Sequence, residues 1–193
     1  GRPKEAINSF NQALAIKPRF YEALKNRGDT FYSTLAIDKA IEDYQRAISL
    51  SPSFIDAWNN LGNALQDQGN YGEAIIAFHK VLELNSQYEF ALGSLAFLKR
   101  CVCDWSESDI EIRKIENAVK NSQRVIHPFF LLAMSDDEAL ALNAARMWIS
   151  ARHAQREALE EISPGHEKDR IRIGHFSADF RLHAVAHLVL GLL

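Results

Sequence analysis

Apolar and small residues recur at a spacing of 34 positions through the first half of the chain. Four columns keep this spacing: Ala6, Ala40 and Ala74; Phe10, Tyr44 and Phe78; Ala13, Ala47 and Val81; Pro18, Pro52 and Ser86. A fixed period of this length is typical of small helical units that stack and share one core. Because proline does not fit inside a helix, Pro18 and Pro52 mark the ends of units. The pattern predicts a row of helical hairpins.

Small residues predict where the two helices of one hairpin come closest. Gly28 and Gly62 share one repeat position, next to a position held by Leu61 and Leu95 in two units and by Arg27 in the first complete one. The period and the columns are those of the tetratricopeptide pattern. The repeats are expected over residues 1–100, as a partial repeat over 1–20, repeats over about 21–54 and 55–88, and a degenerate last repeat from 89.

The columns end near Lys99, and a helical linker region is expected over 101–163. One helix of different spacing is predicted from Ser106 to Asn121, followed by a loop that reaches His127 and Pro128. The run from Ser135 to Glu138 reads as a capping box for a second helix that extends to about Gln155. Apolar residues recur along that helix at Leu142, Ala145 and Ile149.

Residues 164–193 have a sequence pattern that differs from the helical pattern before them. A short apolar stretch, Ile171 to Phe176, predicts a strand, and a loop then precedes an apolar helical stretch. One strand, one loop and one helix form the first β-α unit of a parallel sheet. A single strand cannot bury two faces, so the domain is expected to continue past Leu193. Because residue 1 falls inside a repeat, the chain is expected to be an excerpt of a longer polypeptide.

Composition narrows the classes of partner. The 193 residues carry a formal charge of −3, which does not favour a nucleic-acid backbone as ligand. The longest apolar run, Phe129 to Met134, is too short to cross a membrane. Cys101 and Cys103 lie too close together for a useful disulfide loop and indicate a reducing compartment. We therefore expect a cytoplasmic protein without a membrane segment.

Asparagines recur on the first helix of the predicted hairpins. Asn26 and Asn60 occupy the same repeat position, and Asn63 lies one turn further along. In stacked tetratricopeptide hairpins this helix lines the concave surface. Since a side-chain amide offers both donors and an acceptor, such residues could bind an extended peptide without reading its sequence. The alternative is that they are exposed polar residues with no ligand, and the ladder weakens at Ser94.

Three segments together resemble a known family. The repeats run into Val102-Cys-Asp-Trp105, a His127-Pro128 pair follows, and Arg170-Ile-Arg-Ile-Gly174 leads to Ser177-Ala-Asp-Phe-x-x-His183. This combination resembles the tetratricopeptide-linked glycosyltransferases typified by protein O-GlcNAc transferase, in particular their SPINDLY-like relatives. The resemblance implies a mainly α fold: a helical-hairpin superhelix, linker helices and the first β-α unit of a truncated Rossmann-like lobe.

The resemblance also implies an activity. Family members transfer N-acetylglucosamine from UDP-GlcNAc to Ser or Thr of proteins, with inversion and without a metal ion or other cofactor. By that resemblance His183 is the catalytic-loop histidine, with Asp179 in possible support, and Asn26, Asn60 and Asn63 bind the acceptor. The sequence reads Leu182-His-Ala184 where the family has Asn-His-Pro. His183 and His187 lack a third ligand, so no metal site is predicted.

Two alternatives stay open from the sequence. One is a protein O-fucosyltransferase that uses GDP-fucose, because the residues that choose the nucleotide sugar would lie in the missing lobe. The other is a tetratricopeptide scaffold for protein interaction. In each reading acceptor proteins or peptides occupy the groove, and oligomers through the repeats are compatible with the pattern. The 193-residue piece alone is expected to be inactive as a transferase.

Overall fold

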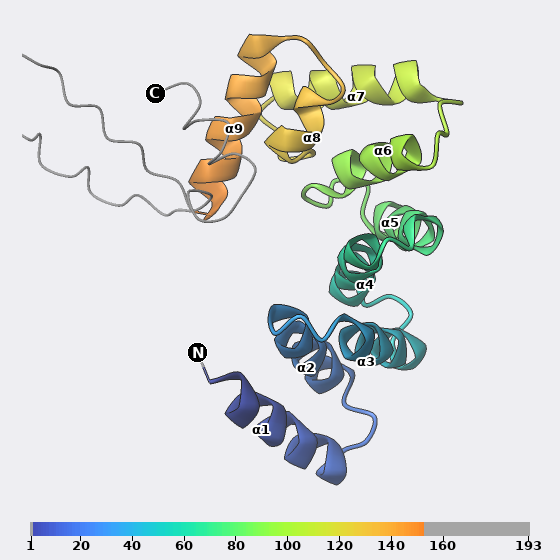
Figure 1. The fold of residues 1–193 in the computed structure, drawn as a ribbon, viewed down its shortest axis with the longest axis vertical. Coiled ribbons are helices and arrows are strands. Elements are labelled where there is room, and N and C mark those ends of the chain that lie inside the picture. Colours follow the sequence, from blue (N-terminus) through green and yellow to red (C-terminus); the bar gives the residue numbers. More distant parts are fainter. Residues whose placement is uncertain (1, 153–193) are drawn as a thin grey trace, which may run out of the picture. The chain divides into compact units, whose positions relative to one another are not determined.

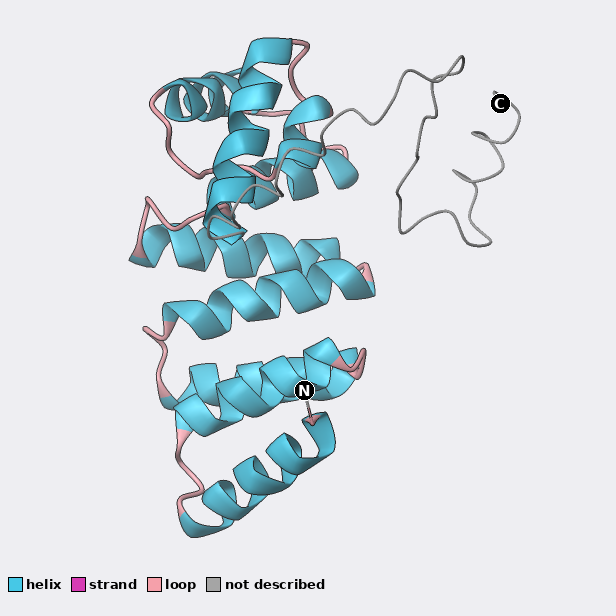
Figure 2. Ribbon diagram, turned by 90° about the vertical axis from the view of Figure 1, so that its left-hand side faces the viewer, coloured by secondary structure: helices cyan, strands magenta, loops and turns pink. Residues whose placement is uncertain are grey.

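The computed structural model describes residues 2–152, and they contain helices and connecting loops but no strand (Figure 2). The helices are α1 (Pro3–Ile16), α2 (Tyr21–Ser33), α3 (Ile37–Leu50), α4 (Ile55–Gln68), α5 (Tyr71–Leu84), α6 (Ala91–Cys101), α7 (Ser108–Lys120), α8 (Pro128–Leu132) and α9 (Glu138–Arg152). The β-α unit predicted over 164–193, with His183 and Asp179, lies outside the described residues. None of the described helices is long and apolar enough to cross a membrane.

Helices α1 to α6 pack in chain order, each against the next, so α2 and α3 form one hairpin and α4 and α5 form another (Figure 1). The glycines lie where the paired helices touch. A Cβ atom added to Gly28 would lie 2.7 Å from the Tyr44 ring, and one added to Gly62 would lie 2.9 Å from the Phe78 ring. The prediction of helical hairpins with small residues at their closest approach is therefore confirmed.

One core runs through these helices. Its largest fully buried side chains, Tyr44 and Phe78, occupy one repeat column, and Ala40, Ala74, Ala47 and Val81 from two other columns are fully buried beside them. Burying a side chain of this size contributes about 2–3 kcal/mol to the free energy of unfolding. Because each hairpin buries its columns against the next, the repeated pattern in the sequence specifies the stack directly.

Arg27, which replaces a leucine of the repeat column, forms a buried ion pair. Its Nε and Nη2 atoms lie 2.7 and 2.6 Å from the two carboxylate oxygens of Asp43, whose side chain is only 4% exposed. Nη1 donates to Oδ1 of Asn11 on α1 at 2.6 Å. The hydrogen bond with Asp43 raises the pKa of Arg27. The next unit has Leu61 and, 34 residues after Asp43, Ala77, so this pair is exchanged as a unit.

A second core joins α6 to α7, α8 and α9. Its buried residues are Ala96, Ile115, Ala118, Val119, Val125, Ile126, Leu131, Leu140 and Ala144. Lys99 on α6 and Glu111 on α7 form an ion pair of 2.6 Å with both side chains 10% exposed. The predicted helix from Ser106 to Asn121 is confirmed, with bounds of Ser108–Lys120.

The predicted helix is confirmed as α9, but the prediction of its cap was wrong. Asp137, not Ser135, caps the helix, because its side chain accepts from the Leu140 N–H at 3.0 Å while the Ser135 hydroxyl donates to Glu116. The buried face holds Leu140 and Ala144, whereas Leu142 and Ile149 are more than half exposed. The helix has apolar residues on several sides, so their spacing alone could not select the face that packs on α7.

The segment between α7 and α8 docks on the start of α6. The carbonyl oxygens of Arg124 and Val125 accept from the N–H groups of Phe90 and Gly93 at 2.7 and 2.8 Å. A Cβ atom on Gly93 would lie 2.5 Å from the side chain of Ile126 and 2.6 Å from its Cα. This docking places α8 beside α6, and it uses N–H groups that a helix start leaves without an intrahelical partner.

Candidate functional site

A hollow of about 220 Å³ lies where α2 and α3 meet α4. It is lined by Asp29, Tyr32, Tyr44, Asn60 and Asn63. Asp29 organises its wall: Oδ1 accepts from the Tyr44 hydroxyl at 3.0 Å and from Nδ2 of Asn60 at 2.8 Å. The other carboxylate oxygen pairs with Nζ of Lys25 at 2.8 Å. Asp29 thus links two successive repeats, and the hydrogen bond holds the Asn60 amide in place.

Tyrosine hydroxyls make similar links between units. The Tyr32 hydroxyl donates to Asp67, and the Tyr88 hydroxyl donates to Asp56 at 2.8 Å. Burial, followed by the bond to Asp67, raises the pKa of Tyr32 to about 12. Burial and the neighbouring carboxylate also raise the pKa of Tyr88. Each hydroxyl therefore stays protonated at neutral pH and keeps donating.

These tyrosine–aspartate links were not predicted. Their partners lie 35 and 32 residues apart, close to the repeat spacing, and that offset is the signal that could have found them. A tyrosine and an acid separated by about one period can meet across the boundary between adjacent units. The two links hold α4 near its end, at Asp67, and near its start, at Asp56.

The predicted acceptor-binding asparagines differ in their surroundings. Asn26 is exposed on α2, and Asn63 is half-buried on α4. Within the described part of the chain, neither side-chain amide makes a hydrogen bond. Asn60 has Nδ2 bound to Asp29, and its Oδ1 accepts from Nδ2 of Asn59 at 3.3 Å. Asn26 and Asn63 keep the full hydrogen-bonding capacity of their amides, while Asn60 keeps only part of it.

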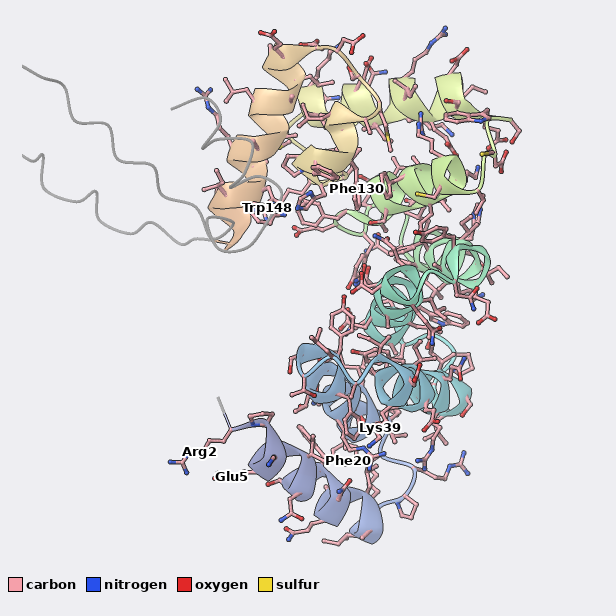
Figure 3. All side chains as sticks on the ribbon, in the orientation of Figure 1. Arg2, Glu5, Phe20, Lys39, Phe130 and Trp148 are labelled. Atoms are coloured by element: carbon pink, nitrogen blue, oxygen red, sulfur yellow. The ribbon has the colours of Figure 1, made fainter. Side chains whose placement is uncertain are left out.

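A second cavity, here called the end pocket, has a volume of about 230 Å³. It is lined by Asn59, Asn63, Gln66, Glu89, Phe90, Ser94, His127, Phe130 and Trp148. Its walls come from α4, from the start of α6, and from α8 and α9. Figure 3 shows Phe130 and Trp148 beside each other where α8 and α9 meet. Because Asn63 lines both cavities, the hollow and the end pocket are neighbours along α4.

The end pocket combines aromatic and polar walls. The His127 ring lies 5.0 Å from Trp148 and 5.5 Å from Phe130, measured between ring centroids. Nδ1 of His127 accepts from the Phe129 N–H at 3.2 Å, so His127 caps α8. Ser94, where the predicted ladder weakens, is 8% exposed. The side chain at this third repeat position is therefore covered, in contrast to the exposed Asn26.

The other sequence-predicted site lies outside the described residues. His183 and Asp179 were expected on a catalytic loop, and the structure describes neither of them. The Val102 to Trp105 motif is described: Asp104 accepts from the N–H of Ser106 at 3.1 Å, and the Trp105 ring lies 5.7 Å from the Arg100 guanidinium. In the described part this motif shapes the turn between α6 and α7.

Comparison with protein families matches two segments. Residues 36–69 match the family described as TPR repeat, and residues 55–88 match the family described as tetratricopeptide repeat. The chain contains tetratricopeptide repeats. These matches fall on α3, α4 and α5, and the first two of these helices also line the hollow. No curated protein sequence matches the chain.

Solved structures share the arrangement of these repeats. The first TPR of Spaghetti (RPAP3), bound to the HSP90 peptide SRMEEVD, is 22% identical with a TM-score of 0.52, over 53% of this chain and 81% of that one. The Sgt2 TPR domain from Aspergillus fumigatus is 29% identical with a TM-score of 0.50, over 56% of this chain and 72% of that one.

A third neighbour is an enzyme. The O-GlcNAc transferase of Thermobaculum terrenum, as its K341M mutant, is 22% identical with a TM-score of 0.56. The match covers 63% of this chain but only 23% of the transferase chain. It shows that the two chains share the helical-repeat fold. The SPINDLY-like assignment made from the sequence stays a prediction.

Proposed function

We propose that the described helices bind an extended peptide segment of a partner protein along α2 and α4. Its path runs from Asn26, past Asn60 and Asn63, to the end pocket. The observation that carries this proposal is the pair of side-chain amides at Asn26 and Asn63, which have no hydrogen-bond partner among the described residues and lie on α2 and α4, two of the helices that line the hollow. Amides of this kind satisfy a peptide backbone whatever its side chains are.

The state of Asn60 sharpens the proposal. Because its Nδ2 already donates to Asp29 and its Oδ1 accepts from Asn59, it offers a ligand one hydrogen and one lone pair. We therefore assign the larger share of backbone recognition to Asn26 and Asn63. The Asp29 link instead sets the distance between the two helices that the peptide crosses.

Binding of fluorescent peptides tests this assignment. Blocked ten-residue peptides rich in Ser and Thr are titrated with the 193-residue chain and followed by fluorescence anisotropy. Asn26→Ala and Asn63→Ala each weaken binding about fivefold, since a hydrogen bond contributes about 1 kcal/mol. Asn8→Ala, an exposed asparagine on α1, serves as the matched control. Unchanged binding by both groove variants would show that peptides do not use this groove.

A second candidate function is that this region guides the acceptor in a protein O-GlcNAc transferase. The support is the likeness to the Thermobaculum terrenum enzyme together with the motifs that end at His183. In this proposal residues 1–100 form the repeats, 101–163 the helical linker, and 164–193 the start of the catalytic lobe. The full protein would transfer N-acetylglucosamine from UDP-GlcNAc to Ser or Thr, or fucose from GDP-fucose, with His183 at the acceptor.

Intact-mass measurement separates these activities. The protein that carries this chain is incubated with a peptide mixture and either UDP-GlcNAc or GDP-fucose, beside a His183→Ala variant. A hexosamine increment that the variant loses supports the GlcNAc transferase, and a deoxyhexose increment supports the fucosyltransferase. No increment with either donor would leave peptide binding as the function. Transfer by the 193-residue chain alone would contradict the assignment of the donor lobe to residues beyond it.

A further inference from the structure

The end pocket presents hydrogen-bond acceptors to whatever enters it. The side-chain oxygen of Gln66 is buried and has no hydrogen-bond partner in the described part of the chain. The amide of Asn63 lines the same cavity, and the carboxylate of Glu89 stands at its rim. A buried oxygen without a donor is destabilising by about 1–3 kcal/mol. The pocket is therefore suited to a ligand that brings several N–H groups.

Asn59, Ser94 and four aromatic side chains form the rest of the wall. Phe90, His127, Phe130 and Trp148 line the cavity, and no lysine or arginine is among its lining residues. Aromatic ring faces attract cations, and a guanidinium group also stacks on them through its flat surface. A carboxylate ligand would instead meet Glu89 and the Gln66 oxygen, which repel it.

Glu89, at the rim of the end pocket, already binds a guanidinium group. It accepts from Nη1 of Arg124 at 3.2 Å, with the two side chains 58% and 42% exposed. An exposed pair of this kind contributes little to stability, so Glu89 can exchange that partner for a second guanidinium at small cost. The planar group of arginine, with five N–H donors, matches the separate acceptor groups of Gln66, Asn63 and Glu89 better than the single ammonium of lysine.

We infer that the end pocket binds the side chain of an arginine in the bound peptide. The inference rests on the proposed peptide function and adds to it a preferred residue. Asn63 lines both the hollow and the end pocket, so a backbone held at Asn26 and Asn63 passes the mouth of the pocket. The cavity of about 230 Å³ has room for one long side chain.

Four peptides that differ at one residue test this preference. Blocked ten-residue Ser/Thr peptides carry Arg, Lys, Glu or citrulline at one central position, and their dissociation constants for the 193-residue chain are compared. Citrulline has the shape of arginine without its charge. The arginine peptide binds about tenfold more tightly than the citrulline peptide, which a cation on aromatic rings and a carboxylate accounts for. Equal affinity for the two peptides overturns the inference.

Substitutions locate the effect. Gln66→Met keeps the length of the side chain and removes the acceptor, and Glu89→Gln removes the rim charge. Each lowers the ratio between arginine and citrulline peptides to about threefold or less, because Gln66→Met removes an acceptor for the guanidinium and Glu89→Gln removes the negative charge that favours arginine over neutral citrulline. Gln12→Met on α1 keeps the full ratio, since Gln12 is exposed and lines none of the pockets described above. Glu89 is itself exposed, so Glu89→Gln remains folded even if Gln66→Met does not.

A small probe separates the pocket from the groove. The indole N–H signal of Trp148, identified with Trp148→Phe among the three tryptophans, is followed by NMR during titration with acetyl-arginine methylamide or acetyl-citrulline methylamide. A shift with the arginine probe alone supports the pocket. If that shift occurs while no peptide binds, the proposed peptide function fails and the pocket stands. If peptides bind while both probes act alike, the arginine pocket is wrong and the peptide function stands.

Discussion

The two cores of the molecule are built on different principles. In the hairpins of α2 to α5, equivalent residues occupy equivalent places, so Gly28 meets Tyr44 as Gly62 meets Phe78. Around α6 to α9, contacts are single events, such as Gly93 against Ile126, with no counterpart elsewhere in the described chain. A repeat column predicts the first kind of contact. The second kind depends on the docking of the loop between α7 and α8 on the start of α6.

This difference shows how the repeats tolerate a change of residue at one column. In the repeats, Arg27 and Asp43 replace a leucine and an alanine of the neighbouring unit and leave the hairpin geometry unchanged. The exchange works because two partners change together at one interface. The second core is not repeated in the described chain. Its contacting pairs therefore cannot be predicted by comparing equivalent positions of two units.

The largest expected effect comes from separating the buried pair. Arg27→Leu leaves the Asp43 carboxylate buried without its partner and lowers the free energy of unfolding by about 3–5 kcal/mol. Adding Asp43→Ala restores the pattern of the next unit and returns stability to within about 1 kcal/mol of the original. Urea unfolding of both single variants and the double variant measures the coupling. Additive losses would contradict the interpretation of the pair as one exchanged unit.

A substitution in the second core gives the next largest effect. Gly93→Ala places a methyl group against the Ile126 side chain and backbone and lowers the free energy of unfolding by about 2–3 kcal/mol. The nearest atoms to a methyl group in Gly28→Ala belong to the Tyr44 side chain and not to backbone, so we expect a smaller loss there. Thermal unfolding of the two variants ranks the rigidity of the two regions. A smaller loss for Gly93→Ala than for Gly28→Ala would reverse the comparison.

The links between repeats have a smaller effect with a pH signature. Tyr32→Phe removes the bond to Asp67 and lowers the free energy of unfolding by about 1 kcal/mol. Because the pKa of Tyr32 is raised to about 12 in the fold, its contribution is complete below pH 10 and is lost as pH rises through 12. Stability measured between pH 9 and pH 12 falls less steeply in Tyr32→Phe. Parallel curves would show that Tyr32 is not the group responsible.

The smallest change is a gain. Gly72→Ala lies on the exposed side of α5, where an added Cβ would meet no atom within 4 Å. Alanine favours the helix over glycine, so the free energy of unfolding rises by about 0.5 kcal/mol. Urea unfolding detects this gain when Gly72→Ala and the unchanged chain are compared side by side. A loss of stability would mean that α5 needs the glycine for a contact absent from the described residues.

Much of the fold followed from the sequence, while much of the site did not. The repeat period located the hairpins, and it drew attention to Asn26, Asn60 and Asn63, whose part in binding stays a proposal. The sequence did not predict that Asn60 has less free hydrogen-bonding capacity than Asn26 and Asn63. That difference depends on the hydrogen bond from Asn60 to Asp29 in the preceding unit. The end pocket escaped prediction altogether. Gln66 and Trp148 lie far apart in the sequence and meet only through the docking of α8 and α9.

The sequence by itself determined the repeated hairpins of this protein, because each repeat column buries the same kind of side chain against the same neighbour. Tertiary structure decided how the chain packs against α6 after the repeats. The loop carbonyls of Arg124 and Val125 accept hydrogen bonds from N–H groups at the start of α6. Because Gly93 has no side chain, Ile126 packs directly against it. Such docking satisfies backbone groups that every helix start exposes, so no side-chain pattern in the sequence specifies it.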